Sequence, residues 1–283
     1  MKQDSKTKSV SQIFVETNIV AANPQIIPSP DNRELMAMAL APFRAMVASA
    51  YRYPVPRANG HDVVVIPGLG TTDESLATLR GMLRRAGYRP TGWEMGVNNG
   101  FTLEDLQRLT ARVRQMAEES GQSVSLIGWS LGGVYARAIA QEAPKAVAQV
   151  ITLGTPWRGI EFTSIAKRHQ AKTGEHISQA IPAPIWRRLQ KTTNKLAVPY
   201  TSIYSRDDGI VDWEACVVEL SPENRAQSIE VSEQHFGLPY SIRIFSIVEE
   251  LLSSDVSPEG WTPHPLADGA ADLTARTGTS FKV

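Results

Sequence analysis

The sequence predicts an α/β fold, a doubly wound and mostly parallel sheet with helices on both faces. Segments typical of strands and of helices alternate along most of the chain, which is the order of βαβ units. Several strand segments, such as "DVVVI" from residue 62, are apolar throughout, and this lack of polar alternation is typical of parallel strands buried on both faces. With 283 residues, the chain is long enough to bury a large core.

Each element follows from a local pattern and its flanking signals. Apolar and β-branched runs predict strands within 62–70, 88–95, 123–129, 146–154, 198–205 and 226–232, of which 88–95 has the weakest signal. Helical spacing of apolar residues predicts helices over 33–52, 72–87, 102–121, 130–144 and 239–253. Thr72 or Asp73 is expected to cap the second of these helices, and Thr102 with Asp105 to cap the third.

Three parts are expected along the chain. Residues 1–59 form an N-terminal arm and helix, and residues 60–252 form the α/β domain. An insertion at about 157–197 is too long for one crossover, and because insertions of that length over a sheet are usually functional, we expect a cap or lid there. Residues 253–283 are rich in Pro, Gly, Ala, Thr and Asp and are expected to be a poorly ordered tail.

Composition argues against several classes of partner and cofactor. Lys plus Arg and Asp plus Glu both number 29, so the basic excess typical of nucleic-acid-binding proteins is missing and we expect no nucleic-acid partner. The five histidines show no metal-ligand spacing and Cys216 is the only cysteine, so we expect no metal, no other cofactor and no intrachain disulfide. A single cysteine fits a reducing compartment, and a cytoplasmic location is expected.

The N-terminal region bears on export and membrane contact. Polar residues interrupt its first apolar stretch, whereas a signal peptide needs a cleaner apolar segment of roughly 7–15 residues. The most apolar stretch, 35–51, contains Pro42 and Arg44 and falls short of the about 20 residues of a spanning helix. The helix over 33–52 is therefore expected to pack on the domain or in a dimer contact, with contact to a membrane surface as the alternative. The sequence leaves the oligomeric state open.

Residues 128–132, "GWSLG", match the G-x-S-x-G pattern where a predicted strand ends and a predicted helix begins. At so sharp a turn the serine is held in strained backbone geometry, with its hydroxyl above the sheet. Side chains at Gly128 and Gly132 would collide with neighbouring backbone. The dipole of the following helix favours an anionic intermediate at Ser130, which is therefore the candidate nucleophile.

A serine hydroxyl needs a base to take its proton and an acid to orient that base. Chains with this elbow carry the three groups in the order serine, acid, histidine. His235 lies between the last predicted strand and the closing helix, where a loop can hold an imidazole over Ser130, and it is the expected base. His169, His176 and His264 lie in the insertion or the tail and are expected to be solvated.

The acid is expected in "YSRDDGIVDW", directly after a predicted strand, which offers Asp207, Asp208 and Asp212. Asp208 is favoured because Val211 can anchor the loop while the carboxylate of Asp208 turns toward His235. Asp207 is expected to face solvent or to form an Asx turn, and Asp212 is the last choice.

An oxyanion intermediate needs two backbone N–H donors. The residue after the nucleophile, Leu131, is expected to supply one donor. The other is expected from Leu69 in the loop "PGLG", which follows the first buried strand.

Together, the stretches "VVVIPGLG", "LIGWSLGG", "VITLGTPWRG", "SIYSRDDGIV" and "EQHFGL" resemble the serine esterase and lipase branch of the α/β-hydrolase superfamily. The resemblance covers roughly residues 60–252, with its elements in the order expected for that family. It implies the α/β-hydrolase fold, a triad and an oxyanion hole, carried by Ser130, Asp208 and His235 and by Leu69 and Leu131.

The chain departs from that pattern at two positions. Many relatives have histidine where this chain has Pro67, which is tolerable because the donor there is backbone. Many lipases have histidine where this chain has Trp157, a change that would alter the pocket wall. Related bacterial hydrolases also carry a loop like "GWEMGVNNG" (92–100), in which Asn98 or Asn99 is expected to bond backbone beside the acyl pocket.

These observations predict a carboxylic ester hydrolase that forms an acyl-enzyme on Ser130. The apolar residues of the insertion favour a small-molecule ester with an apolar acyl group, and Trp129 and Trp157 are expected to contact it. An acyltransferase with the same triad, a thioesterase or an amidase is the alternative. A non-catalytic module on the same scaffold is a further alternative, which the intact triad candidates disfavour.

Overall fold

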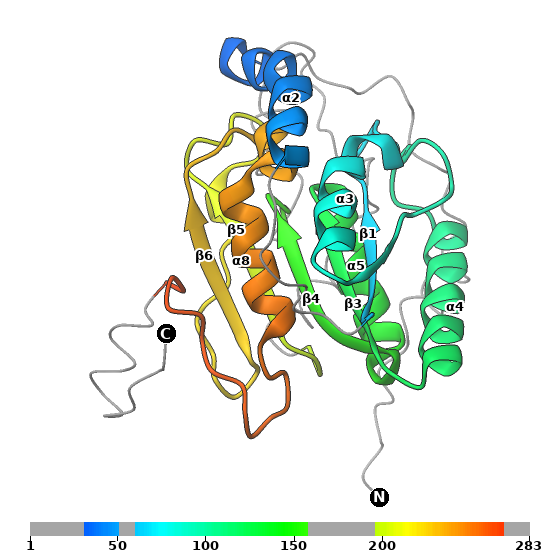
Figure 1. Cartoon of the computed structure of the whole chain (residues 1–283). Helices are drawn as coiled ribbons and strands as arrows, with labels where there is room; N and C mark the ends of the chain where they lie inside the picture. Colours follow the sequence, from blue (N-terminus) through cyan, green and yellow to red (C-terminus); the bar gives the residue numbers. More distant parts are fainter. Residues whose placement is uncertain (1–30, 51–59, 158–195, 269–283) are drawn as a thin grey trace, which may run out of the picture.

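The computed structural model describes residues 31–50, 60–157 and 196–268. Six parallel strands form one sheet in the order β2-β1-β3-β4-β5-β6, as Figure 1 shows. The strands are β1 (Asp62–Ile66), β2 (Arg89–Thr91), β3 (Val124–Trp129), β4 (Val147–Leu153), β5 (Tyr200–Ser205) and β6 (Ala226–Val231). The predicted parallel α/β sheet is confirmed.

Helices connect and cover these strands. The α-helices are α2 (Asn32–Ala50), α3 (Ala77–Arg85), α4 (Leu103–Ser120), α5 (Leu131–Glu142) and α8 (Ile242–Ser253). Short 3-10 helices are η1 (Asp73–Leu76), η2 (Pro144–Ala146), η5 (Trp213–Ala215) and η6 (His235–Tyr240). The chain first winds outward from β1 to β2 and then crosses back to β3, so the winding direction reverses between β1 and β3. Sites in open α/β sheets form at the carboxyl ends of strands beside such a reversal.

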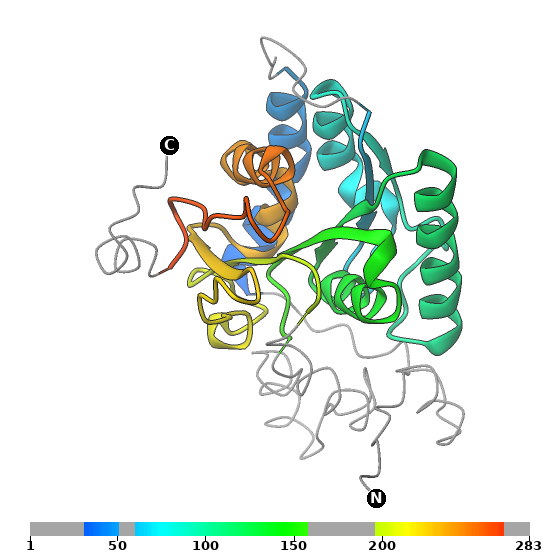
Figure 2. The same cartoon turned by 90° about the horizontal axis from the view of Figure 1, so that it is seen from below.

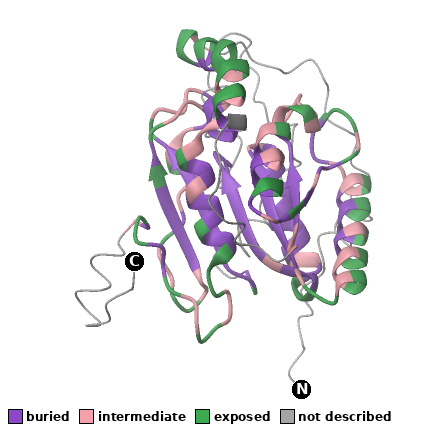
Figure 3. Ribbon diagram, viewed as in Figure 1, coloured by how far each residue is buried: buried purple, intermediate pink, exposed green. Residues whose placement is uncertain are grey.

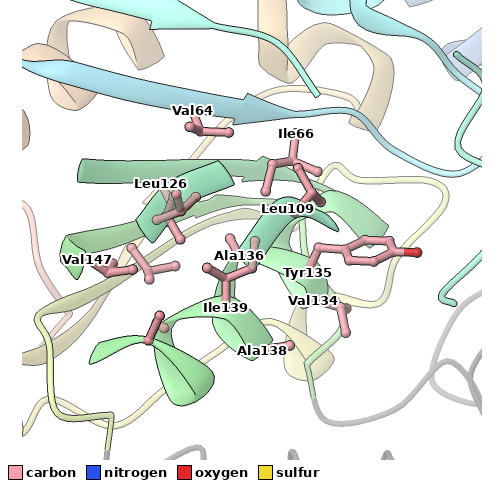
Figure 4. Close-up of a cluster of buried hydrophobic side chains, with 14 of the residues drawn as sticks. Val64, Ile66, Leu109, Leu126, Val134, Tyr135, Ala136, Ala138, Ile139 and Val147 are labelled. Carbon is pink, nitrogen blue, oxygen red and sulfur yellow. The ribbon is translucent and has the colours of Figure 1, made fainter. Parts of the chain in front are cut away.

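The sheet is buried on both faces, as predicted from the lack of polar alternation in the strand segments (Figure 3). On one face α4 and α5 pack against strand residues, and this cluster includes Ile66, Leu109, Leu126 and Tyr135 (Figure 4). On the other face α3 and α8 cover a second cluster, which includes Leu83. Figure 2 shows these two helix layers on opposite sides of the sheet.

The N-terminus of α4 has the side-chain cap that the sequence predicted, whereas the N-terminus of η1 is held by a contact with a distant segment. The Thr102 side chain accepts from the N–H of Asp105 at 3.0 Å, which confirms that cap. Thr72 is the N-cap residue of η1, as expected, but its side chain forms no capping hydrogen bond. The Asp73 carboxylate instead accepts from Trp93 N at 2.7 Å and from Glu94 N at 2.8 Å, so it joins the start of η1 to the segment after β2.

The prediction of a poorly ordered tail is wrong for residues 254–268, which pack beside β6 and α8. Ala267 forms an antiparallel bridge with Ile229. His264, expected in solvent, is 8% exposed, and its Nε2 lies 2.8 Å from Glu250 Oε2. The composition of this segment did not indicate order, because the segment is held by backbone and polar side-chain bonds to the sheet edge as well as by the burial of Ala267.

The helix α2 lies beyond the ends toward which β4 and β6 point in Figure 1, and it packs on η6 and α3. Ala37 and Ala48 are buried in that contact. Its other side exposes the apolar side chains of Leu35, Met36, Met38, Leu40, Phe43, Met46 and Val47. Within the described ranges, no helix has both the length and the apolar character needed to cross a bilayer. Contact of α2 with a membrane surface stays a prediction.

The predicted lid at about 157–197 lies outside the described residues, apart from its ends. The N-terminal arm before residue 31 also lies outside them. Both stay predictions.

Candidate active site

Ser130 occupies the turn between β3 and α5. Its backbone has φ 54° and ψ −123°, a positive φ that residues other than glycine rarely adopt. The Ser130 N–H donates to Leu153 O at 2.8 Å, and Thr155 Oγ1 donates to the Ser130 carbonyl at 2.9 Å. These bonds to the end of β4 hold the strained residue in place.

The two glycines of the elbow leave room for neighbouring backbone. A Cβ added to Gly128 would collide with the backbone of Gly133. A Cβ added to Gly132 would collide with the Ile66 carbonyl at the end of β1. The steric reason predicted for both glycines is confirmed.

Ser130 is also the accessible point of the elbow. Every other residue from 124 to 140 is buried, whereas Ser130 is partly exposed. The loop after β1 reaches it, because a Cβ added to Gly68 would lie 3.1 Å from Ser130 Cβ. Leu69 follows in that loop, and Leu131 is the first residue of α5, a position whose N–H has no intrahelical partner. Both predicted oxyanion donors thus lie on segments that border Ser130.

Asp208 and His235 meet in a buried hydrogen bond. His235 Nδ1 lies 2.6 Å from Asp208 Oδ2, and the two side chains are 3% and 2% exposed. The second oxygen, Asp208 Oδ1, accepts from the N–H groups of Ile210 and Val211, each at 2.8 Å. The loop therefore orients the carboxylate, as expected from the position of Val211.

The neighbouring aspartate faces away from the histidine. Asp207 accepts from Arg33 Nη2 at 3.1 Å and from Ser232 Oγ at 2.7 Å, and its side chain is 39% exposed. Asp212 lies directly before η5. Of the three candidate acids, Asp208 is the one that pairs with His235 in the structure.

The electrostatic environment of His235 favours its protonated form. Burial by itself lowers the pKa of His235, but the charge and hydrogen bond of Asp208 and the charge of Glu34 raise it. The net result is a pKa above the ordinary histidine value. An imidazole that gains a proton so readily is suited to act as a base.

The end of β4 joins the serine to the Asp208–His235 pair. Leu153 accepts from Ser130 N, and the next residue, Gly154, has φ +54°. A Cβ added to Gly154 would lie 3.0 Å from Asp208 Oδ2 and 3.1 Å from His235 Nδ1. No role was predicted for Gly154 from the sequence, although a glycine at the end of a buried strand was the signal available.

Trp129 and Trp157, expected to contact substrate, are both buried against protein groups. The Trp129 ring lies 5.5 Å from the His235 ring, and its Nε1 donates to His235 O at 3.3 Å. The Trp157 Nε1 donates to Cys216 O at 2.8 Å, and the Arg137 guanidinium lies over its ring. Trp129 thus supports His235, and substrate contact by either indole stays a prediction.

The segment 92–100 braces the loop that carries Leu69. Asn98 is fully buried, and its Nδ2 donates to Pro67 O at 2.8 Å. Asn98 also exchanges backbone bonds with this loop, from Asn98 N to Thr71 O at 2.9 Å and from Gly70 N to Asn98 O at 2.8 Å. The expected bonding of backbone is confirmed for Asn98, whereas Asn99 is exposed.

The described part of the chain offers neither a reactive cysteine nor a metal cluster beside this site. Burial raises the pKa of the Cys216 thiol well above its usual value, so the reactive thiolate is disfavoured. No cluster of three or more His, Cys, Asp or Glu side chains in 31–50, 60–157 and 196–268 has the arrangement of a metal site.

Known proteins resemble this chain in sequence. Residues 62–207, slightly more than half of the chain, match the model of the family described as palmitoyl protein thioesterase. A triacylglycerol lipase of Burkholderia plantarii is 33% identical over 141 residues, 47% of this chain and 37% of the relative. Another, of Pseudarthrobacter phenanthrenivorans, is 44% identical over 62 residues, 22% of this chain and 19% of the relative. The matches thus span well under half the length of either lipase.

Solved structures resemble the fold. A mature lipase of Bacillus licheniformis superposes with a TM-score of 0.51 at 16% identity, over 72% of this chain and 94% of that chain. Lipase B of Aspergillus fumigatus superposes with a TM-score of 0.56 at 16% sequence identity, over 72% of this chain and 55% of that chain. At such low identity these likenesses bear on the fold alone, and they agree with an α/β-hydrolase fold. The chain therefore belongs to the palmitoyl protein thioesterase family, among the serine esterases and lipases of the α/β-hydrolase fold.

Proposed function

We propose that the chain is a carboxylic ester hydrolase whose nucleophile is Ser130, with His235 as base and Asp208 as its orienting acid. The observation that carries the proposal is the arrangement around the end of β4. Ser130 is bonded to Leu153, and the following Gly154 lies against the buried Asp208–His235 pair. A strained, accessible serine beside a buried carboxylate–imidazole pair is the constellation that nucleophilic acyl transfer requires.

The acylation step uses each of these groups. Ser130 Oγ attacks the acyl carbonyl carbon while His235 Nε2 takes its proton, and the Asp208 carboxylate stabilises the imidazolium that forms. The carbonyl oxygen becomes an oxyanion, which accepts from the N–H groups of Leu69 and Leu131. The bond to the leaving group then breaks, and the leaving alcohol or thiol takes the proton from His235.

Deacylation repeats the same steps with water as the nucleophile. His235 takes a proton from water, whose oxygen attacks the acyl-enzyme carbonyl. The intermediate collapses to a carboxylic acid, and Ser130 Oγ recovers its proton from His235.

The substrate class we propose has an apolar acyl group joined to an oxygen or a sulfur leaving atom. The names of the matching family and relatives, palmitoyl protein thioesterase and triacylglycerol lipase, support this class. An oxygen ester and a thioester with the same acyl chain form the same acyl-enzyme, so the triad geometry is compatible with both leaving atoms. Rates on an oxygen ester and a thioester with the same acyl chain would assign the preference.

Fluorophosphonate labelling tests the nucleophile. Wild-type protein is expected to take up the label at Ser130, and Ser130→Ala is expected to lose it, with ester hydrolysis falling by roughly 10⁴-fold or more. Circular dichroism of Ser130→Ala would establish that it is folded. Labelling that persists in the folded variant would contradict the proposal.

A series of p-nitrophenyl esters tests the acyl group. We expect kcat/KM to rise with chain length, because each added methylene buries more apolar surface. A profile confined to short chains would contradict an apolar acyl pocket. Adding acceptor alcohols to the same assay tests the acyltransferase alternative, which requires transfer to the alcohol to outrun hydrolysis.

A further inference from the structure

The mechanism leaves one fully buried carboxylate beside the site unused. Glu34 lies in the first turn of α2 and has no exposed surface. The helix begins at this point because Asp31 Oδ1 accepts from the N–H groups of Arg33 and Glu34, at 3.0 and 2.9 Å. A carboxylate in the first helical turn is also favoured by the helix dipole. Its side chain is thus fixed at the point where α2 meets the sheet.

The carboxylate of Glu34 bonds the backbone of two separate loops. Its Oε1 accepts from Gly209 N and from His235 N, each at 2.8 Å. Its Oε2 accepts from Phe236 N at 3.0 Å. Gly209 follows Asp208 in the loop after β5, called the acid loop below. His235 and Phe236 belong to the segment after β6, called the base loop below. The Glu34 side chain therefore connects the acid loop to the base loop.

These three bonds are strong ones. Removing a charged group from water is costly unless it is hydrogen-bonded, and three backbone donors meet that requirement for Glu34. Hydrogen bonds to an ionised acceptor are about twice as strong as neutral ones. The Glu34 carboxylate can therefore hold the two loops at a set separation.

Other contacts of α2 reach the same loops. Arg44 Nη1 lies 2.6 Å from Glu233 Oε2, two residues before His235. Arg33 Nη2 lies 3.1 Å from Asp207 Oδ1, directly before Asp208, although this pair is largely exposed. Figure 1 shows α2 beyond the ends of the strands from which these loops leave. The family match begins at residue 62, so α2 is an addition to the matched region.

We propose that Glu34 is a positioning residue of the active site, which fixes the acid loop and the base loop so that Asp208 and His235 stay bonded. This inference rests on the proposed hydrolase function. It makes α2 part of the active enzyme rather than an accessory segment. Misplacement of reacting groups by about 1 Å can cost 10²-fold in rate, so loosening the two loops should affect turnover.

Glu34→Gln is the variant that tests this role. Glutamine keeps the size and one acceptor oxygen but loses the charge, and its amide nitrogen cannot accept a backbone N–H. We expect kcat to fall roughly 10- to 100-fold, with KM changed by no more than about twofold, because the substrate does not touch Glu34. A fall in stability alone would leave kcat unchanged when kcat is calculated per folded molecule.

The titration of His235 supplies a second readout that does not need activity. The charged groups packed around its loop are Asp208, Glu34 and the Arg44–Glu233 pair. Loss of the Glu34 charge removes one interaction that favours the imidazolium. The NMR titration midpoint of the His235 ring is therefore expected at a lower pH in Glu34→Gln than in wild type.

Glu249→Gln is the matched control, since Glu249 is a buried glutamate of α8 that is 2% exposed. Its neighbour Leu251 accepts from Gln149 near the start of β4, at the opposite end of the sheet from Ser130. We expect this variant to lose stability while keeping kcat and the His235 midpoint.

Wild-type kcat together with an unchanged His235 midpoint in folded Glu34→Gln would overturn the inference. If Glu34→Gln does not fold, Glu34→Asp replaces it. Aspartate keeps the charge but shortens the reach, so it should lower kcat, and a wild-type kcat would equally overturn the inference. Wild-type protein that shows no hydrolysis and no fluorophosphonate label would refute the proposed function, whereas the titration would still test the contact of Glu34 with the His235 loop.

Discussion

Asp208 divides its two oxygens between its own loop and the histidine, and this division determines what its replacement should do. One oxygen accepts from Ile210 and Val211, and the other bonds His235. In Asp208→Asn the loop bonds can persist while the charge is lost, so we expect kcat to fall roughly 10³- to 10⁴-fold. Steady-state kinetics of the folded variant would measure this.

The same variant is expected to change the pH profile. The base must be neutral to accept a proton, so kcat/KM declines as the pH falls through the raised pKa of His235. Losing the Asp208 charge lowers that pKa and moves the decline to lower pH. Asp207→Asn is the control, because its carboxylate bonds Arg33 and Ser232 instead. Equal effects of the two substitutions would contradict this assignment of the acid.

At the scale of elements, the segment 92–100 and the loop after β1 form one hydrogen-bonded unit through Asn98. In Asn98→Ala the buried Pro67 carbonyl loses its side-chain donor, which should cost about 1–3 kcal/mol of stability. The Leu69 donor should also lose its position, lowering kcat by about tenfold or more. Chemical denaturation and kinetics together would measure both effects.

The adjacent exposed asparagine offers a matched control for that prediction. Asn99→Ala changes the same residue type in the same loop but removes no buried contact, so stability and kcat should stay near wild type. Similar losses in both variants would contradict the bracing role of Asn98.

At the scale of the whole molecule, the ordered segment 254–268 closes the sheet edge at β6. The His264 N–H donates to Gln227 Oε1 at 2.7 Å, near the start of β6 and therefore at the end of the sheet opposite Ser130. The His264 ring bonds Glu250 through Nε2 at 2.8 Å and accepts from Leu266 N through Nδ1 at 3.1 Å, and alanine would remove both ring contacts. We expect His264→Ala to lower the free energy of unfolding in urea by about 1–2 kcal/mol without changing kcat. Leu266→Ala, at a side chain 49% exposed, is the control. An unchanged unfolding free energy in His264→Ala would contradict a stabilising role of the His264 side chain.

Most of the fold could be predicted because its signals are local. A continuous apolar run such as the one in β4 indicates a strand buried on both faces, and apolar residues three or four positions apart indicate a helix. The segment 254–268 could not be predicted, since its order depends on pairing with a strand formed by distant residues. Composition measures what a segment buries by itself and not what it bonds to.

Much of the candidate site was also predictable. By itself the sequence determined the elbow around Ser130 and the loop positions of Asp208 and His235. The elbow is encoded by the glycines next to the serine, and each loop position is indicated by the predicted strand that precedes it. Only the tertiary structure decided that Gly154 lies against the Asp208–His235 pair and that Glu34 bonds both of their loops. Those contacts join segments far apart in the chain, and their meeting depends on how helices and strands pack, which no local pattern encodes.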